Sequence, residues 1–271
     1  MHHLKTHTTP TNLADTFKVY WTNTSKRLRG VLTVQVRSPI ADSAIAAELS
    51  AMQYLLEDQC VIGENMVGSV NTQLIVSQGA IRKLQRRGSD KAHLAPYASF
   101  LVTRFAACKI SVAKDTQWFD NYLPELAESL LVEGARCESV HITGLGKVVI
   151  TRHALMRFAE RNLNVAANDC AFHDHLPYDI APKAWRKLVE AVSDSDVHEV
   201  YSDSIWKGVN SSRNAYVRQK GRYFLNPKRN LILVIVADIS LGMTLVTIFA
   251  ANSTYRAIPA IATARLALAA A

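Results

Sequence analysis

The stretch Lys147-Val148-Val149-Ile150-Thr151-Arg152-His153-Ala154-Leu155-Met156-Arg157-Phe158-Ala159-Glu160-Arg161 joins a short apolar run to a helical pattern. The apolar run predicts a buried strand, and the pattern that follows predicts an amphipathic helix. His153, Arg157 and Arg161 recur every four residues, so a helix places their side chains on one face, away from the apolar side chains. The sequence therefore predicts a strand that leads into a helix with one imidazole and two guanidiniums in a row.

This row of side chains is suited to binding phosphate. A planar guanidinium binds two phosphate oxygens at once, and a histidine that titrates near neutral pH can move a proton in the same site. The alternative is an ordinary solvated basic face, in which His153 only caps the helix.

The rest of the second half predicts an antiparallel meander with helices on one face. A strand at 140–142 precedes the stretch above, and a helix is predicted after Pro182 because several apolar residues share one face. The pattern as a whole predicts an α+β domain over residues 138–271. The three strands of the meander are predicted at residues 215–225, 231–238 and 243–250.

The first half predicts a strand-rich α/β domain over residues 17–135, preceded by a flexible N-terminus at 1–16. The helix at 43–57 has apolar residues at helical spacing, with Ser43 as its cap. Further helices are predicted at residues 72–84, 96–107 and 123–132. Strands are predicted at residues 17–21, 30–36, 61–70 and 109–113.

The order of these elements resembles the ribonuclease H fold, and five short segments are similar to motifs of that family. The resemblance implies a ribonuclease H-like domain, whose chemistry needs several carboxylates to hold two divalent cations. At the matching positions Asn23, Asn71 and Pro124 replace carboxylates, and Glu48 is the only one that remains. We therefore expect a catalytically silent copy of the fold without a metal or other cofactor. The similar segments are Thr22-Asn23-Thr24-Ser25, Ala46-Ala47-Glu48-Leu49-Ser50-Ala51, Asn71-Thr72-Gln73-Leu74-Ile75-Val76, Ser111-Val112-Ala113-Lys114 and Leu123-Pro124-Glu125-Leu126-Ala127.

Arg82, Arg86 and Arg87 form a basic cluster at the end of the helix predicted at 72–84. Such a cluster could hold a nucleic-acid duplex or an RNA/DNA hybrid through its phosphates. An ordinary solvated helix face is the alternative.

The second half is similar to the compact metal-independent ribonucleases, the group that includes barnase, the EndoU and colicin nucleases and the RelE-type toxins. The shared elements are a helix that carries His and Arg and a sheet whose last strand offers a hydroxyl, here Thr247. The resemblance implies that His153 acts as general base or acid, while Arg157 and Arg161 hold the phosphate.

Two other groups in the second half bear on its chemistry. Arg218 and Arg222 lie on the first strand of the meander and could contact the nucleic acid, with Tyr216 beside them. The segment Cys170-Ala171-Phe172-His173-Asp174-His175 contains zinc-binding residue types, but it lacks the second distant pair that structural zinc sites use. We therefore expect no metal in this half either.

Composition indicates a basic globular protein. The formal charge is +8 and the isoelectric point is near 9.4, which favours an anionic partner: nucleic acid first, an acidic protein second and a membrane surface third. The four cysteines are dispersed without a C-x-x-C pair, so we expect free thiols and a cytoplasmic location. The longest apolar run, 231–237, is too short to span a bilayer, and residues 1–12 lack the apolar core of a secretory signal. No membrane partner is expected.

These observations predict an RNA-binding protein with a metal-independent endoribonuclease in its second domain. The alternative is a catalytically inactive effector of the viral or mobile-element kind, which binds nucleic acid or blocks an acidic or RNA-binding host protein. A DNA-binding regulator is a weaker hypothesis because no helix-turn-helix spacing is present. Whether the chain forms a homodimer stays open.

Overall fold

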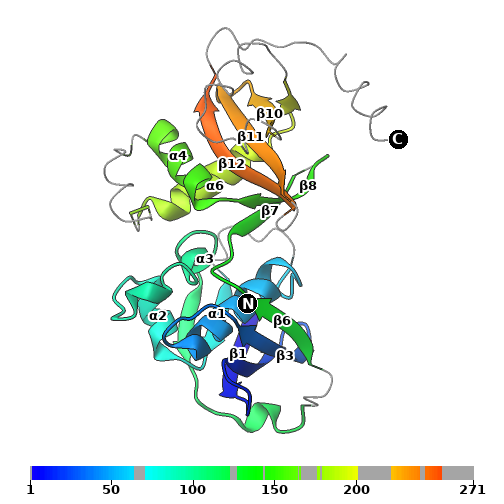
Figure 1. Ribbon diagram of the computed structural model, residues 1–271, viewed down its shortest axis with the longest axis vertical. Coiled ribbons are helices and arrows are strands. Elements are labelled where there is room, and N and C mark those ends of the chain that lie inside the picture. The colour runs from blue at the N-terminus through cyan, green and yellow to red at the C-terminus, as the bar shows by residue number, and fades with distance from the viewer. Residues whose placement is uncertain are drawn as a thin grey trace. The chain divides into compact units, whose positions relative to one another are not determined.

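The computed structural model describes residues 2–63, 71–122, 127–142, 144–163, 165, 176–177, 179–200, 221–238 and 242–251 (Figure 1). The chain divides into two compact units. The first comprises Met1–Arg136 with Ala181–Arg186, and the second comprises Cys137–Ile180 with Lys187–Ala271. Each unit combines helices with a mixed sheet, so the protein belongs to the mixed α/β class.

The described residues of the first unit contribute six strands to one sheet. They are β1 (His2–Pro10), β2 (Thr16–Asn23), β3 (Leu28–Val36), β4 (Thr72–Val76), β5 (Lys109–Val112) and β6 (Glu128–Val132). Their order is β5-β4-β1-β2-β3-β6. β1, β2 and β3 are antiparallel neighbours, whereas β4 runs parallel to β1, β5 to β4 and β6 to β3.

The N-terminal segment lies inside this sheet. Sequence analysis predicted a flexible segment at 1–16, which is wrong for His2–Pro10, because β1 pairs with β2 on one side and β4 on the other. Leu4, Thr6 and Thr8 are buried and the residues between them are not, which is the period-two pattern of a half-buried strand. The polar composition of the segment obscured that pattern, although threonine is a good strand former.

The helix α1 (Ser43–Glu57) covers one face of this sheet and confirms the prediction for residues 43–57. Its apolar residues pack into the core of the first unit with β1, β2 and β3. Ser43 does not cap it: Asp42 is the N-cap residue, with φ 61°, and the Ser43 hydroxyl instead donates to Asp15 at 2.9 Å.

Three predicted elements of the first unit are wrong. Residues 72–76 form β4 rather than the start of a helix, because Leu74 and Val76 are buried in alternation with half-buried neighbours. The helix α2 (Gly79–Gln85) begins only after this strand, and the helix predicted at 96–107 is reduced to α3 (Ser99–Val102). Residues 128–132 form β6 and not a helix. Two short 3-10 helices, η1 (Ala92–Leu94) and η2 (Gln117–Phe119), complete the unit as described.

The second unit also has a six-stranded sheet in its described part, in the order β7-β8-β12-β11-β10-β9. β8 and β12 are parallel, and the other neighbours are antiparallel. The strands of the predicted meander are confirmed where the structure describes them. The strands are β7 (Glu138–Ile142), β8 (Gly146–Ile150), β9 (His198–Glu199), β10 (Gly221–Asn226), β11 (Leu231–Asp238) and β12 (Gly242–Ala250). The helices are α4 (Arg152–Asn162) and α6 (Ala181–Val192), of which the residues from Lys187 onward belong to this unit.

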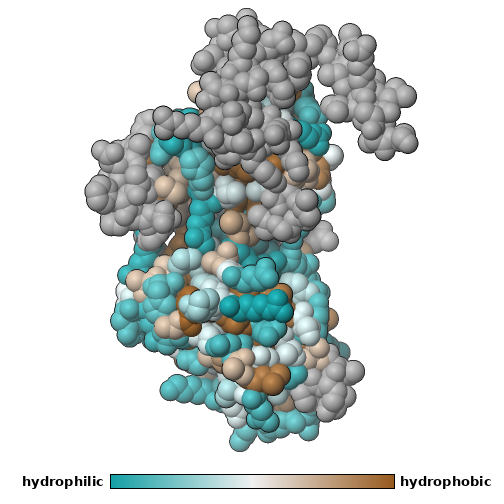
Figure 2. All heavy atoms as spheres, in the orientation of Figure 1, coloured by the Kyte–Doolittle hydropathy of each residue, from teal (hydrophilic) through white to brown (hydrophobic). Residues whose placement is uncertain are grey.

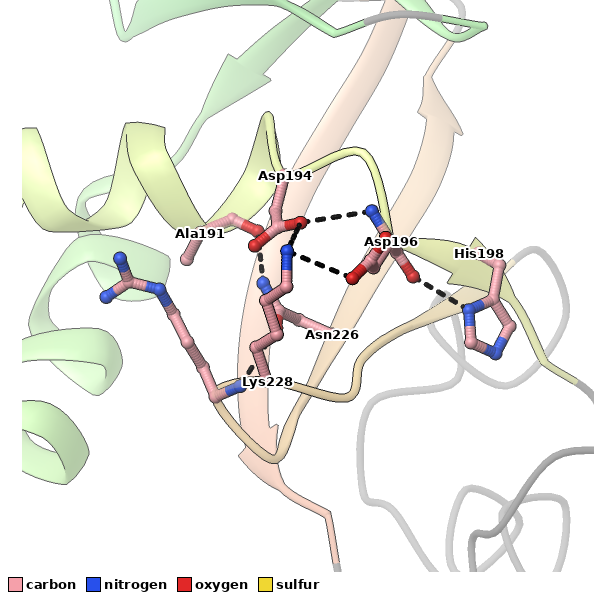
Figure 3. A network of polar contacts seen from close by, with 7 residues as sticks. Ala191, Asp194, Asp196, His198, Asn226 and Lys228 are labelled. Atoms are coloured by element: carbon pink, nitrogen blue, oxygen red, sulfur yellow. Dashed lines mark hydrogen bonds and ion pairs between the residues drawn. The ribbon is translucent and has the colours of Figure 1, made fainter.

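A polar network ties the β10–β11 turn to the end of α6 (Figure 3). The buried Asn226 side chain donates to the Ala191 carbonyl at 2.8 Å. The Lys228 ammonium lies 3.2 Å from Asp194 and 3.0 Å from Asp196, in an exposed setting where such pairs stabilise little. The buried hydrogen bond of Asn226 therefore stabilises the turn more than the exposed ion pairs of Lys228 do, and we assign this network a structural role.

The side of the first unit seen in Figure 2 is mostly hydrophilic, with small apolar areas between the polar ones. No helix in the described ranges is long and apolar enough to cross a membrane. The exposed large hydrophobic residues among those described are Leu13, Leu28, Leu131 and Phe249.

Candidate functional site

Thr151 fixes the start of α4 against β12. Its side-chain oxygen accepts a hydrogen bond from the Ala154 N–H at 3.1 Å, and its hydroxyl donates to the Leu245 carbonyl at 3.0 Å. The Thr151 N–H donates to the same carbonyl at 3.2 Å. A cap of this kind stabilises a helix by about 1 kcal/mol. Because Thr151 is the cap, the capping role considered for His153 is wrong.

The helix α4 presents the predicted row of His153, Arg157 and Arg161, which we call the α4 row. Arg157 is half-buried, and His153 and Arg161 are more exposed but still partly covered. At a rise of 1.5 Å per residue, the row extends about 12 Å along the helix. The buried residues of α4 are Ala154, Leu155, Phe158 and Ala159.

The electrostatics of the α4 row favour a neutral imidazole. Partial burial lowers the pKa of His153 below its usual 6.5, and the charges of Arg157 and Arg161 lower it further. Glu160 acts in the opposite direction, but Arg157 pairs with its carboxylate at 2.7 Å. A neutral imidazole at physiological pH can accept a proton, while both guanidiniums stay charged.

The row continues onto β12 through an aromatic residue that the sequence analysis missed. The Arg161 guanidinium lies 5.3 Å from the centre of the Phe249 ring, and Phe249 is 41% exposed. α4 therefore runs beside β12 from residue 245, where Thr151 binds, to residue 249. A partly exposed ring beside a guanidinium can stack on a nucleobase. The sequence indicated Phe249 only as an aromatic residue at the end of a predicted strand, and that is weak evidence for a functional role.

Two hydroxyl groups share one face of this sheet. Thr247 lies opposite Val234, and Val234 lies opposite Tyr223, so the three side chains point to the same side. Phe249 pairs with Ile232, two residues from Val234, and belongs to that side as well. The Tyr223 hydroxyl is buried and has no hydrogen-bond partner among the described residues. Burial raises the pKa of Tyr223 to about 12, so the group remains an O–H donor.

Arg222 does not join this group. It lies opposite Ile235 on β11, which places it on the other face of the sheet from Tyr223. Its guanidinium donates two hydrogen bonds, at 2.9 and 2.8 Å, to the Glu199 carboxylate. Arg218, Tyr216 and the segment 170–175 lie outside the described residues.

Arg82, Arg86 and Arg87 are all exposed in the first unit, but α2 is too short to align them. Arg82 lies in the last turn of α2, whereas Arg86 and Arg87 follow the helix. Arg87 itself takes a left-handed conformation with φ 53°. The cluster is therefore a helix end and the turn after it, not a helix face.

Glu48 is a fully buried carboxylate on α1, and hydroxyl groups surround it. Thr6 on β1 donates to its Oε1 at 2.8 Å, and the backbone N–H of Ser77 donates to the same oxygen at 2.8 Å. The Ser77 hydroxyl donates to Oε2. Burial raises the pKa of Glu48, and the hydrogen bonds from Ser77 and Thr6 oppose that effect.

The residues expected to surround Glu48 lie elsewhere. Asn23 is buried at the end of β2, where its amide donates to the Val61 carbonyl at 2.7 Å. Asn71 precedes β4, and its carbonyl accepts from the His2 N–H at 2.9 Å. Pro124 lies outside the described residues. Asn23 and Asn71 thus make other contacts in the structure, while β1, which the sequence did not reveal, contributes Thr6 to Glu48.

Comparison of the chain with family models, curated proteins and solved structures finds no match. Within the described ranges, no three or more His, Cys, Asp or Glu side chains are grouped so as to hold a metal ion.

Proposed function

We propose that this chain is an RNA-binding protein whose second unit cleaves RNA without a metal ion. The observation that carries the proposal is the α4 row beside β12, where a neutral imidazole lies within the electrostatic influence of two guanidiniums. Phe249 and the hydroxyl of Thr247 lie on the strand beside the row. A base, two cations and an aromatic ring are the groups needed to bind and cleave a phosphodiester that has a neighbouring hydroxyl.

In the proposed reaction the 2′-oxygen of RNA attacks the adjacent phosphorus. His153 accepts the 2′-hydroxyl proton, the new bond to phosphorus forms, and the bond to the 5′-oxygen breaks. Water protonates the leaving 5′-oxygen, the proton on His153 returns to the solvent, and Arg157 and Arg161 stabilise the negative charge on the phosphorane. The products are a 2′,3′-cyclic phosphate and a free 5′-hydroxyl. DNA lacks the attacking group and should not be cleaved.

The first unit is proposed to be a ribonuclease H-like module without catalytic activity. The order of its strands and helices is compatible with such a fold: three antiparallel strands precede α1, and three strands follow it that each pair in parallel with a neighbour, β4 and β5 on one side of the sheet and β6 on the other. The loss of activity is supported by Glu48, whose neighbours Thr6 and Ser77 supply hydroxyls where a metal pair would need further carboxylates. Its role is then to bind nucleic acid.

The test is cleavage of labelled single-stranded RNA by the full chain in EDTA. Wild type should produce 2′,3′-cyclic phosphate ends and leave DNA of the same sequence intact. His153→Ala should lose about a hundredfold or more in rate with RNA affinity nearly unchanged. His141→Ala, another exposed histidine of the second unit, is the matched control and should keep full activity.

If wild type binds RNA but never cleaves it, and His153→Ala binds equally well, the proposal of catalysis is wrong. The inactive nucleic-acid-binding or protein-binding effector then takes its place.

A further inference from the structure

The face of the first unit's sheet that points away from α1 carries cationic and aromatic side chains. On β1, Thr6 contacts Glu48 of α1, so its neighbours Lys5 and His7 point to the opposite side. The strand register extends this face, because His7 lies opposite Tyr20, and Lys5 lies in one row with Thr22 and Arg29. We call this side the aromatic face.

The segment around η2 adds three rings to the aromatic face. Phe119 stacks on Tyr20, with ring centres 4.1 Å apart and planes at 11°. Trp118 meets Phe119 edge-on at 5.0 Å and Tyr122 edge-on at 5.7 Å. All four rings are half-buried, so part of each remains in contact with solvent. The rings hold one another in place before any ligand arrives.

Positive charge borders these rings directly. The Lys5 ammonium lies 4.8 Å from the centre of the Trp118 ring, and the Arg29 guanidinium lies 5.3 Å from that of Tyr122. Lys18 lies on the same side of β2 as Tyr20. Two acidic residues lie in the segment around η2. The Asp115 carboxylate is 3.9 Å from the Lys5 ammonium, and Asp120 is exposed.

We infer that the aromatic face binds single-stranded nucleic acid. Preformed aromatic rings stack on unpaired bases without regard to sequence, and neighbouring cations bind the phosphates between those bases. A duplex hides its base faces and gives the rings nothing to stack on. If the rings served only to cover the sheet, they would not need lysine and arginine placed over them. The charge complementarity therefore favours a polyanion with exposed flat bases.

This inference does not depend on the proposed ribonuclease activity. Stacking and phosphate contacts do not require a 2′-hydroxyl, so single-stranded DNA should bind even though the proposed site cannot cleave it. Binding of single-stranded DNA therefore tests the aromatic face independently of cleavage at the α4 row. A failure of cleavage would leave the inference intact, and a failure of DNA binding would leave the proposed cleavage intact.

The test uses full-length His153→Ala protein and a fluorescein-labelled oligo(dT) of about twelve nucleotides, within the range that one such face covers. Trp118→Leu with Tyr122→Leu keeps apolar cover over the sheet but removes two stacking surfaces. Because two stacking surfaces are lost, we expect this variant to bind at least about thirtyfold more weakly. Tryptophan fluorescence should be quenched on binding, and the quenching should fall sharply in the Trp118 variant.

The cations are tested separately with Lys5→Gln and Arg29→Gln in one chain. Losing two phosphate contacts should lower the slope of log affinity against log salt by about 1.4 for a single strand. Arg37→Gln removes one exposed cation at the other end of β3 and should leave the affinity nearly unchanged. Melting temperatures of all variants establish that the first unit remains folded.

Two results would overturn the inference. One is unchanged oligo(dT) affinity in a folded Trp118→Leu, Tyr122→Leu variant. The other is a duplex DNA of equal length binding as tightly as the single strand, since that would show that the rings do not contact bases.

Discussion

Replacing Glu57 with glutamine should remove a pH dependence from the stability of the first unit. Glu57 is the last residue of α1, and burial raises the pKa of its carboxyl from 4.5 to about 7. Arg104 and Arg136 lower that pKa, but less than burial raises it. The Gln53 amide donates to the Glu57 carboxyl at 3.3 Å, and a glutamine can still accept this bond.

The sign follows from where the proton is held. Between pH 4.5 and about 7 the folded protein keeps a proton on Glu57 that the unfolded chain has lost. The free energy of unfolding therefore falls as the pH rises through this window, and the loss is complete above it. The full pKa difference corresponds to about 3 kcal/mol. Because Glu57 retains partial contact with solvent, we expect about 1 to 2 kcal/mol in practice.

The assay is hydrogen exchange of the α1 peptide amides in the full chain at pH 5 and pH 8, corrected for intrinsic exchange rates. Wild type should lose protection between the two values, whereas Glu57→Gln should change little and be the more protected protein at pH 8. Glu133→Gln alters an exposed glutamate of the same unit and should behave as wild type. An equal loss of protection in wild type and Glu57→Gln would refute the assignment of the pH dependence to this carboxyl.

Three further predictions concern function. If His153 is the general base, the acidic limb of the cleavage rate against pH should have its midpoint below 6.5, because burial and the neighbouring arginines lower the histidine pKa; a midpoint above 7 would contradict this. Neutralising Arg82, Arg86 and Arg87 together should weaken nucleic-acid binding and reduce the salt slope by about three, and an unchanged slope would make that cluster an ordinary solvated surface. Mg²⁺ or Mn²⁺ should leave the melting temperature of the first unit unchanged, because the buried Glu48 carboxylate already accepts hydrogen bonds from Thr6 and Ser77; a metal-dependent rise lost in Glu48→Gln would show otherwise.

The sequence predicted elements that have a dense apolar pattern. α4 and the strands β11 and β12 were found because their apolar residues repeat with the period of a helix or form an uninterrupted run. β1 was missed because threonines occupy most of its buried positions, so its alternation does not appear as alternating hydrophobicity. β4 was mistaken for helix because its apolar residues lead without interruption into those of α2.

The residues of the candidate site also fall into those that a local sequence pattern reveals and those that it does not. The α4 row depends on spacing within one helix, which the sequence contains in full. Phe249 and Tyr223 depend on strand register, because Phe249 meets Arg161 and Tyr223 aligns with Thr247 only once β10, β11 and β12 are paired. Register is set by turns and by irregularities such as the shift at Val234 and Ile235, which no local pattern reveals.

The hydrogen bonds of Glu48 bear on where any chemistry in this chain can occur. Its Oε1 already accepts two hydrogen bonds, from Thr6 and the Ser77 backbone, and its Oε2 accepts one from the Ser77 hydroxyl. A cation could bind this carboxylate only by displacing buried hydrogen bonds, and each donor left without a partner would cost about 1 to 3 kcal/mol. A single carboxylate repays that cost poorly, since a metal pair that acts on a phosphodiester needs several. The α4 row of the second unit instead offers two charged guanidiniums and an imidazole with a lowered pKa, and the proposed reaction there uses no metal ion. This contrast is in line with the proposal that the first unit binds nucleic acid and the second unit cleaves it.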